Sequence, residues 1–249
     1  MQGAEPFKSA GDGANSCIGV LVIHGLTSTP QSMSPIFEAL AASGYAVSAP
    51  LLPGHGTTWQ DMNTTRYADW LVAVREAATE LRESCDTLIV VGMSLGGALA
   101  SDLAAGRPDL VDAVVLINPA FAAEDPRLVA LPVIKHVLPT LPGLAGQIRR
   151  PDGPQELAYD RLPLKAFHSF VRRWDGLARD LVLLKQPVLL LRSAHDDLVP
   201  LSSANRFLSN VGSDSVRQVW LPNSGHVATL DYDQELLLEE VISFVGTHG

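Results

Sequence analysis

The sequence predicts an α/β protein with a mostly parallel central sheet flanked by helices. Apolar runs of strand length alternate with longer amphipathic stretches along most of the chain, and this alternation is typical of strands joined by crossover helices. The strand-like runs are hydrophobic almost without interruption, which indicates burial on both faces of the sheet. The 249 residues are 47% hydrophobic and suffice for one large core, so we expect a single domain over residues 1–249.

Six apolar runs have the length and composition of buried strands. They span residues 18–23, 45–50, 87–92, 113–117, 187–192 and 216–221. Five longer stretches that follow or separate these runs have the apolar spacing of amphipathic helices. They span residues 32–43, 67–84, 95–105, 203–211 and 233–245. We therefore expect strands and helices to alternate through most of the sheet.

The alternation fails between residue 120 and about residue 165, in a segment rich in proline and aliphatic residues. Its apolar residues Leu131, Ile134, Leu138 and Leu141 recur at helical spacing, which usually indicates packing against the core. The segment separates the fourth strand from the fifth, above the carboxyl ends of the strands, where α/β sheets bind ligands. We therefore expect a cap insertion at about 120–165 whose underside receives an apolar substrate.

The segment Gly92-Met93-Ser94-Leu95-Gly96 directly follows the apolar run 87–91. It fits a nucleophile elbow, in which a serine sits on a sharp turn between a buried strand and a helix. A serine in that strained turn crowds the residues two before and two after it, so glycine fits at both positions. A plain glycine-rich turn would match the same short pattern. The strand before it, the helix-compatible sequence after it and the polar residues downstream favour a catalytic role.

Two downstream segments supply the base and the carboxylate that a serine nucleophile requires. His226 comes just after the last predicted strand, and Asp196 comes just after the preceding one. The chain order serine, aspartate, histidine is the order expected of the fold that carries such an elbow. Asp197 competes with Asp196, because sequence alone does not separate adjacent carboxylates. The spacing to Val199-Pro200 favours Asp196.

A tetrahedral oxyanion needs donors that are already in place, normally two backbone N–H groups. Leu95 follows the serine and supplies the first. Leu26 lies in the turn His24-Gly25-Leu26-Thr27 after the first strand, and we expect it to supply the second. We interpret His24 and His55 as hydrogen-bonded structural residues. The seven histidines do not have the spacing of metal ligands, so we expect no metal site.

The chain has 18 basic and 27 acidic residues, for a formal charge of −9. Lysine and arginine form no cluster, so we expect no nucleic-acid partner, and the negative charge favours an uncharged substrate. Residues 1–16 are polar where a signal peptide would be apolar, and no apolar run is long enough to span a bilayer. We expect a cytoplasmic protein without stable membrane insertion. Cys17 and Cys85 suit a reducing compartment, and two free thiols are favoured over a pair. The oligomeric state does not follow from the sequence.

At these residues the chain resembles the bacterial monoacylglycerol lipases and related carboxylesterases of the α/β-hydrolase fold. The resemblance covers most of the length. Its motifs are His24-Gly25-Leu26-Thr27, Gly54-His55-Gly56-Thr57, Gly92-Met93-Ser94-Leu95-Gly96-Gly97, Glu156-Leu157-Ala158-Tyr159, His195-Asp196 and Ser224-Gly225-His226-Val227-Ala228-Thr229-Leu230-Asp231. The last motif is long enough to be specific, whereas the elbow alone indicates only the superfamily.

The resemblance implies a serine ester hydrolase that cleaves monoacylglycerols or similar short uncharged carboxylic esters through an acyl-enzyme, without a cofactor. It implies Ser94, Asp196 and His226 as the catalytic triad. It also implies the N–H groups of Leu26 and Leu95 as the donors to the oxyanion.

The same resemblance implies that Glu156, in the cap insertion, accepts hydrogen bonds from the hydroxyls of the alcohol; a plain surface carboxylate is the alternative. Two other functions remain open. One is a different reaction on the same triad, by a thioesterase or a carbon–carbon bond hydrolase. The other is a ligand-binding protein that keeps the fold without turnover. The presence of all three triad residues argues against the second.

Overall fold

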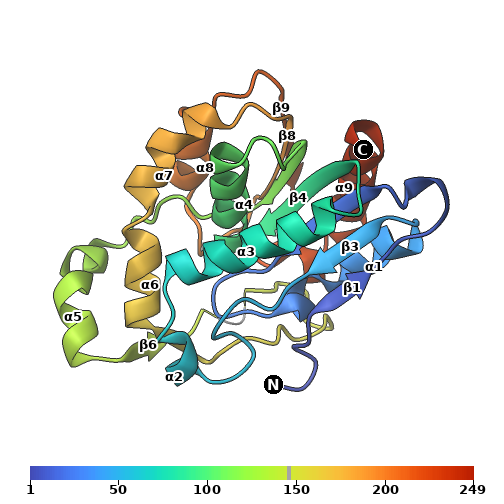
Figure 1. Ribbon diagram of the computed structural model, residues 1–249. Coiled ribbons are helices and arrows are strands. Elements are labelled where there is room, and N and C mark those ends of the chain that lie inside the picture. Colours follow the sequence, from blue (N-terminus) through green and yellow to red (C-terminus); the bar gives the residue numbers. More distant parts are fainter. Residues whose placement is uncertain (145–146) are drawn as a thin grey trace.

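Within the residues that the structure describes, 1–144 and 147–249, seven strands form one central sheet in this computed structural model (Figure 1). Ala145 and Gly146, inside the predicted cap insertion, lie outside the described residues. The strands are, in spatial order, β1 (Phe7–Ser9), β3 (Ala46–Ala49), β2 (Ile18–Ile23), β4 (Thr87–Met93), β5 (Ala113–Ile117), β8 (Val188–Ser193) and β9 (Val216–Leu221). β1 pairs antiparallel with β3, and the other pairs in this sheet are parallel. The expected α/β class is confirmed.

Helices cover both faces of the sheet. One face packs against α1 (Ser34–Ala42) and α9 (Gln234–His248). The other packs against α3 (Tyr67–Arg82), α4 (Leu95–Gly106) and α8 (Leu201–Leu208); α3 crosses in front of the sheet in Figure 1. Successive residues of a strand point to opposite faces. The unbroken apolar sequence of the central strands therefore fills two cores at once.

The predicted strands and helices are present with nearly the expected ends, but the sequence analysis missed β1. This strand is three residues long and includes Lys8, so it carries no hydrophobic signal of its own. Its position depends on tertiary contacts, because Phe7 stacks on Phe37 of α1 with ring centroids 4.4 Å apart. The expectation of burial on both faces is wrong at the opposite edge. There β9 has only one strand neighbour, and Trp220 is 52% exposed.

The segment predicted to form a cap, about residues 120–165, is called the cap insertion below. It contains α5 (Leu131–Val137) and a short antiparallel hairpin of β6 (Thr140–Pro142) and β7 (Arg161–Pro163), which leads into α6 (Leu164–Val171). In Figure 1, α5 lies at the left, beside α6. The expected helical run through Leu138 and Leu141 is wrong. Leu138 precedes Pro139 and is extended, with φ −112° and ψ 124°, because proline disfavours helical backbone in the residue before it.

The remaining helices are α2 (Trp59–Met62) and α7 (Trp174–Asp180), among the described residues. Short 3₁₀ turns occupy Gly13–Asn15, Pro30–Met33, Pro126–Ala130, Leu181–Leu183 and Ala228–Leu230. In the part of the chain that the structure describes, no helix is both long and apolar enough to cross a membrane. Cys17 is exposed, Cys85 is buried, and both are free thiols.

Candidate active site

Ser94 is the single residue between the end of β4 and the start of α4. Its backbone has φ 57° and ψ −116°, a conformation that costs a residue with a side chain on the order of 1–3 kcal/mol. Hydrogen bonds hold the turn in this shape. The Ser94 N–H donates to the carbonyl of Ile117 at 3.0 Å, and the Ser94 carbonyl accepts from the N–H groups of Ala98 and Ala120. The turn therefore presents the serine hydroxyl at the carboxyl edge of the sheet.

The glycines around Ser94 are required by close backbone contacts. A Cβ atom at Gly92 would lie 2.2 Å from the carbonyl oxygen of Gly96. A Cβ atom at Gly96 would lie 2.2 Å from the carbonyl oxygen of Ile23 in the neighbouring strand β2. The two glycines thus relieve contacts with each other and with β2, rather than with the serine side chain. Either position allows only glycine without a shift of backbone.

His226 and Asp196 form a hydrogen-bonded pair. The distance from His226 Nδ1 to Asp196 Oδ2 is 2.7 Å, and both side chains are almost fully buried. The other carboxylate oxygen of Asp196 accepts from the N–H groups of Leu198 and Val199 at 2.9 and 2.8 Å. Asp197 is exposed. The structure thus pairs the histidine with Asp196 and turns Asp197 to solvent.

Asn118 links the two loops that carry this pair, and the sequence analysis missed it. Its side-chain amide donates to the His226 carbonyl at 2.9 Å and to Ser193 Oγ at 2.8 Å. Its Oδ1 accepts from the Ser193 N–H at 2.8 Å. Asn118 is buried and has a positive φ of 43°, which asparagine tolerates better than most residues. Its place directly after β5, at the carboxyl edge of the sheet, was the available sequence signal.

The N–H groups expected to bind the oxyanion belong to Leu95, the residue after Ser94, and to Leu26, in a turn next to Ser94. Leu95 is the first residue of α4, so its N–H has no acceptor within the helix. The turn that contains Leu26 lies against the serine, since a Cβ atom at Gly25 would be 3.5 Å from Ser94 Cβ. Thr27 has a positive φ of 63° and shapes this turn. Among the described residues, neither the Leu26 nor the Leu95 N–H donates a hydrogen bond.

His24 and His55 are buried behind this turn. His24 Nδ1 lies 2.9 Å from the Gly25 carbonyl, and its Nε2 accepts from the Leu52 N–H at 3.2 Å. Burial lowers the pKa of His24 from 6.5 to about 4. Burial also lowers the pKa of His55 well below its ordinary value, and the neighbouring His24 acts in the same direction. Both rings are therefore neutral at pH 7, and His24 serves as a structural hydrogen-bonded residue.

Glu156 reaches the same small cavity as Ser94, Leu26 and His226. It is half-buried, and burial raises the pKa of its carboxyl group above the ordinary value, while nearby Ser28 and His226 act in the opposite direction. Gln31 holds the backbone on both sides of it. The Gln31 amide donates to the Gln155 carbonyl at 3.2 Å and accepts from the Leu157 N–H at 2.9 Å.

Asp231 joins the cap insertion to the loop of His226. It is 0% exposed and accepts hydrogen bonds from the N–H groups of Gly225, Arg149 and Arg150 at 2.8, 2.9 and 2.9 Å. Gln31 and Asp231 thus fasten the chain from the cap insertion at two places. Sequence reasoning missed both roles, because a lone glutamine or aspartate in a turn gives no signal of a distant partner.

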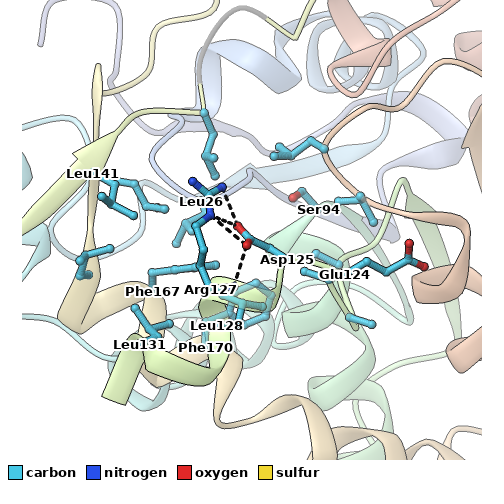
Figure 2. A pocket seen from close by; sticks show the side chains of 18 of the residues that line it. Leu26, Ser94, Glu124, Asp125, Arg127, Leu128, Leu131, Leu141, Phe167 and Phe170 are labelled. Atoms are coloured by element: carbon cyan, nitrogen blue, oxygen red, sulfur yellow. Dashed lines mark hydrogen bonds and ion pairs between the residues drawn. The ribbon is translucent and has the colours of Figure 1, made fainter. Parts of the chain in front are cut away.

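A larger cavity of about 770 Å³ opens beside Ser94 (Figure 2). In Figure 2 the side chains of Leu131, Leu141 and Phe167 gather across the cavity from Ser94. Leu131, Ile134, Leu138 and Leu141 all line it, so the cap insertion supplies an apolar wall although its helix ends early. Asp125 and Arg127, which also line the cavity, pair with each other at 2.7 Å. Within the described residues, no group of three or more histidine, cysteine or acidic side chains is arranged to hold a metal.

The sheet, the elbow and the histidine–aspartate pair together define an α/β-hydrolase. The chain matches the Hydrolase_4 family model, described as serine aminopeptidase, S33, over residues 15–233, and belongs to this family. It is 36% identical to the thermostable monoacylglycerol lipase of Bacillus sp. (strain H-257), and the match covers 100% of this chain and 97% of that protein. It is 22% identical to a carboxylesterase of Bacillus subtilis, with 91% of each chain covered.

Solved structures agree with this fold. A structure reported for LipS and LipT, two metagenome-derived lipolytic enzymes, is similar with a TM-score of 0.94 and 37% identity, covering 100% of this chain and 99% of the other. The monoacylglycerol lipase of Paleococcus ferrophilus shares the fold with a TM-score of 0.78 at 21% identity, covering 93% of this chain and 95% of the other.

Proposed function

We propose that this chain hydrolyses monoacylglycerols through an acyl-enzyme formed on Ser94, with His226 and Asp196 completing the triad. The chain is a carboxylic ester hydrolase by its similarity to lipolytic enzymes over its whole length. The proposal therefore concerns the residues that act and the ester that is cleaved. The observation that carries it is the buried His226–Asp196 hydrogen bond of 2.7 Å beside a serine at the mouth of an apolar cavity.

In the first step the hydroxyl oxygen of Ser94 attacks the ester carbonyl carbon, and His226 Nε2 takes the hydroxyl proton. The carbonyl oxygen becomes an oxyanion, which accepts hydrogen bonds from the N–H groups of Leu26 and Leu95. Asp196 accepts from His226 Nδ1–H, so it fixes the tautomer of the ring and stabilises the imidazolium.

The tetrahedral intermediate then expels the alcohol, which takes the proton from His226. Water enters, gives a proton to His226 and attacks the acyl carbon of the ester on Ser94. Collapse of this second intermediate releases the carboxylic acid and returns the proton to Ser94. The sequence involves no change of oxidation state, because the alcohol leaves with the proton that Ser94 gave up and a proton of the water molecule restores the hydroxyl of Ser94.

The two cavities suit the two parts of a monoacylglycerol. The large apolar cavity beside Ser94 suits an acyl chain, whose burial removes apolar surface from water. Glu156, in the small cavity next to His226 and Leu26, suits the glycerol end, because a carboxylate accepts hydrogen bonds from two hydroxyls. An uncharged ester also avoids repulsion by a chain of net charge −9.

We propose that the enzyme acts in the cytoplasm on a small-molecule ester. We expect it neither to bind nucleic acid nor to insert stably into a membrane. The free thiols of Cys17 and Cys85 support a reducing compartment. The acidic balance of the sequence supports the absence of a nucleic-acid partner.

The proposal is tested by Ser94→Ala, assayed with a monoacylglycerol and with a chromogenic short-chain ester. We expect kcat for both substrates to fall by a factor on the order of 10⁴ or more, with the fold intact. Ser209→Ala, at an exposed serine of the same fold, is the matched control and should keep full activity. Near wild-type turnover by folded Ser94→Ala would refute the assignment of the nucleophile.

A further inference from the structure

A second cavity, of about 170 Å³, lies behind the loop that carries Asp196. Its walls come from the carboxyl ends of three neighbouring strands and from the start of α8. They include Asn118, Arg192, Asp196, Pro200, Leu201 and Trp220. The volume is sufficient for a small polyatomic ion together with water. Ser94 and the apolar residues of the cap insertion are not among its lining residues in the described chain.

Arg192 gives this cavity a buried positive charge. The residue is only 9% exposed, and its guanidinium carbon lies 4.2 Å from the centre of the Trp220 ring. One guanidinium nitrogen donates to Gln218 Oε1 at 3.2 Å. No ion pair joins Arg192 to a carboxylate in the part of the chain that the structure describes.

A guanidinium group has five N–H donors, so this arrangement leaves most of them without a partner from the protein. Burial lowers the pKa of Arg192, and no acidic neighbour opposes that effect. Among the described residues, no nitrogen atom of Arg192 is both buried and without a partner, so its remaining N–H groups reach solvent and are accessible to a ligand in the cavity. The contact with Trp220 stabilises the cation through the face of the ring and occupies none of these N–H donors.

The start of α8 adds positive potential to the same cavity. Leu201 is the first residue of this helix and lines the cavity, and the first N–H groups of a helix have no acceptor within it. Asp196 also lines the cavity, but its two oxygens already accept from Leu198, Val199 and His226. These bonds occupy its oxygens, and no ion pair joins it to Arg192 among the described residues. Its negative charge remains and opposes the positive charge of Arg192 in the binding of an anion.

We propose that this cavity binds a small oxyanion, such as a carboxylate or phosphate group, as the counter-ion of Arg192. The bound anion accepts hydrogen bonds from the free guanidinium N–H groups and from the start of α8. It stabilises the folded enzyme in a cavity that Ser94 does not line, although Asp196, Val199 and Pro200 line both this cavity and the large cavity beside Ser94. The alternative is that Arg192 only packs on Trp220 and needs no ligand.

The test is thermal unfolding, followed by circular dichroism, during titration with sodium phosphate or sodium acetate at constant ionic strength. Ser94 is first blocked with a fluorophosphonate, so that an anion in the oxyanion site does not contribute. We expect the melting temperature to rise and saturate. At ten times Kd the ratio of folded to unfolded protein rises about elevenfold, which corresponds to several degrees for a chain of this size. The anion that saturates at the lower concentration identifies the ligand as phosphate-like or as a short carboxylate.

Three variants decide whether Arg192 is responsible. Arg192→Gln should abolish the saturable rise, and Arg192→Lys, which keeps the charge and the aliphatic stem, should weaken it at least severalfold. Arg179→Gln, which removes one exposed arginine from α7, should behave as the wild type. The proposal is overturned by the same saturation in Arg192→Gln as in the wild type, or by a linear rise in every protein, which is the general effect of salt. If Arg192→Gln does not fold, unchanged binding by Arg192→Lys overturns it.

Discussion

Replacement of Glu156 should change the choice of alcohol without changing the chemistry at Ser94. The Glu156 carboxylate lies in the small cavity that Ser94 and His226 also line, and it has no part in the proton transfers. Glu156→Ala removes a charged acceptor from the hydroxyls of the glycerol. Loss of such a hydrogen bond costs about 1.5–3 kcal/mol, which is roughly 10- to 150-fold in kcat/KM. Glu156→Gln keeps one acceptor oxygen, so its loss of kcat/KM should lie at the lower end of this range.

The assay compares kcat/KM for a monoacylglycerol and for the methyl ester of the same fatty acid. Glu156→Ala should reduce the first and spare the second, because methanol has no hydroxyl pair to bind. Gln31→Ala should shift the ratio in the same direction by less than about tenfold, since it loses two hydrogen bonds that hold Gln155 and Leu157 but keeps the carboxylate. Asp160→Asn, at an exposed carboxylate of the same segment, is the control and should leave the ratio unchanged.

Lowering the pH should reduce the preference of the wild type for the monoacylglycerol, as Glu156→Ala does. Burial raises the pKa of Glu156, so its carboxylate is protonated at a higher pH than that of an exposed glutamate. The preference for the monoacylglycerol over the methyl ester should therefore decline as pH falls, beginning above the ordinary range for glutamate. Equal slowing of both substrates by Glu156→Ala would refute this reasoning. Glu156 would then only support the cap insertion, and a general carboxylesterase would be the better description.

Three further predictions concern the triad loops and the buried histidines. Asp196→Asn should reduce kcat far more than Asp197→Asn, because only Asp196 contacts His226; a larger loss at Asp197 would reverse the assignment. Asn118→Ala leaves the His226 carbonyl and the Ser193 N–H without their partner. The variant should therefore have a lower kcat with little change in KM, and its fold should be less stable by about 2–4 kcal/mol. An unchanged kcat in the folded variant would contradict the positioning role of Asn118. The folded-state pKa of His24 is about 4, below its ordinary 6.5, so its contribution to stability is complete above pH 6.5 and is lost as pH falls toward 4. The free energy of unfolding, measured with urea, should fall by about 2 kcal/mol from this group between pH 7 and pH 5, and His24→Gln should reduce that slope, whereas the exposed His136→Gln should not.

The inner strands of the central sheet were predictable because they are buried on both faces. A run such as Ile18–Ile23 or Ala113–Ile117 has no polar alternative, since each residue faces one of two cores. β1 was not predictable, because three residues of mixed polarity acquire their conformation from pairing with β3. The sequence did contain a signal for the end of α5, because Pro139 disfavours helical backbone at Leu138. The spacing of the apolar residues instead favoured a longer helix.

The candidate triad was predictable because each member follows a strand of the parallel part of the sheet, and the carboxyl ends of parallel strands meet at one edge. The residues that hold the segments of the site in place were not predictable. Asn118, Gln31 and Asp231 act through hydrogen bonds to backbone groups far away in the sequence. Such contacts depend on the path of a loop and not on any local pattern, so only the structure reveals them.

Covalent labelling of Ser94 tests the central claim most directly. The wild-type protein is treated with a fluorophosphonate, and its rate of ester hydrolysis is measured until inactivation is complete. The modified peptide is then identified by mass spectrometry. We predict one adduct per chain, on Ser94, formed in step with the loss of activity, and no comparable labelling in Asp196→Asn, where His226 loses the carboxylate that orients it. Full hydrolysis after stoichiometric modification of Ser94, or inactivation with the adduct on another residue, would contradict the account.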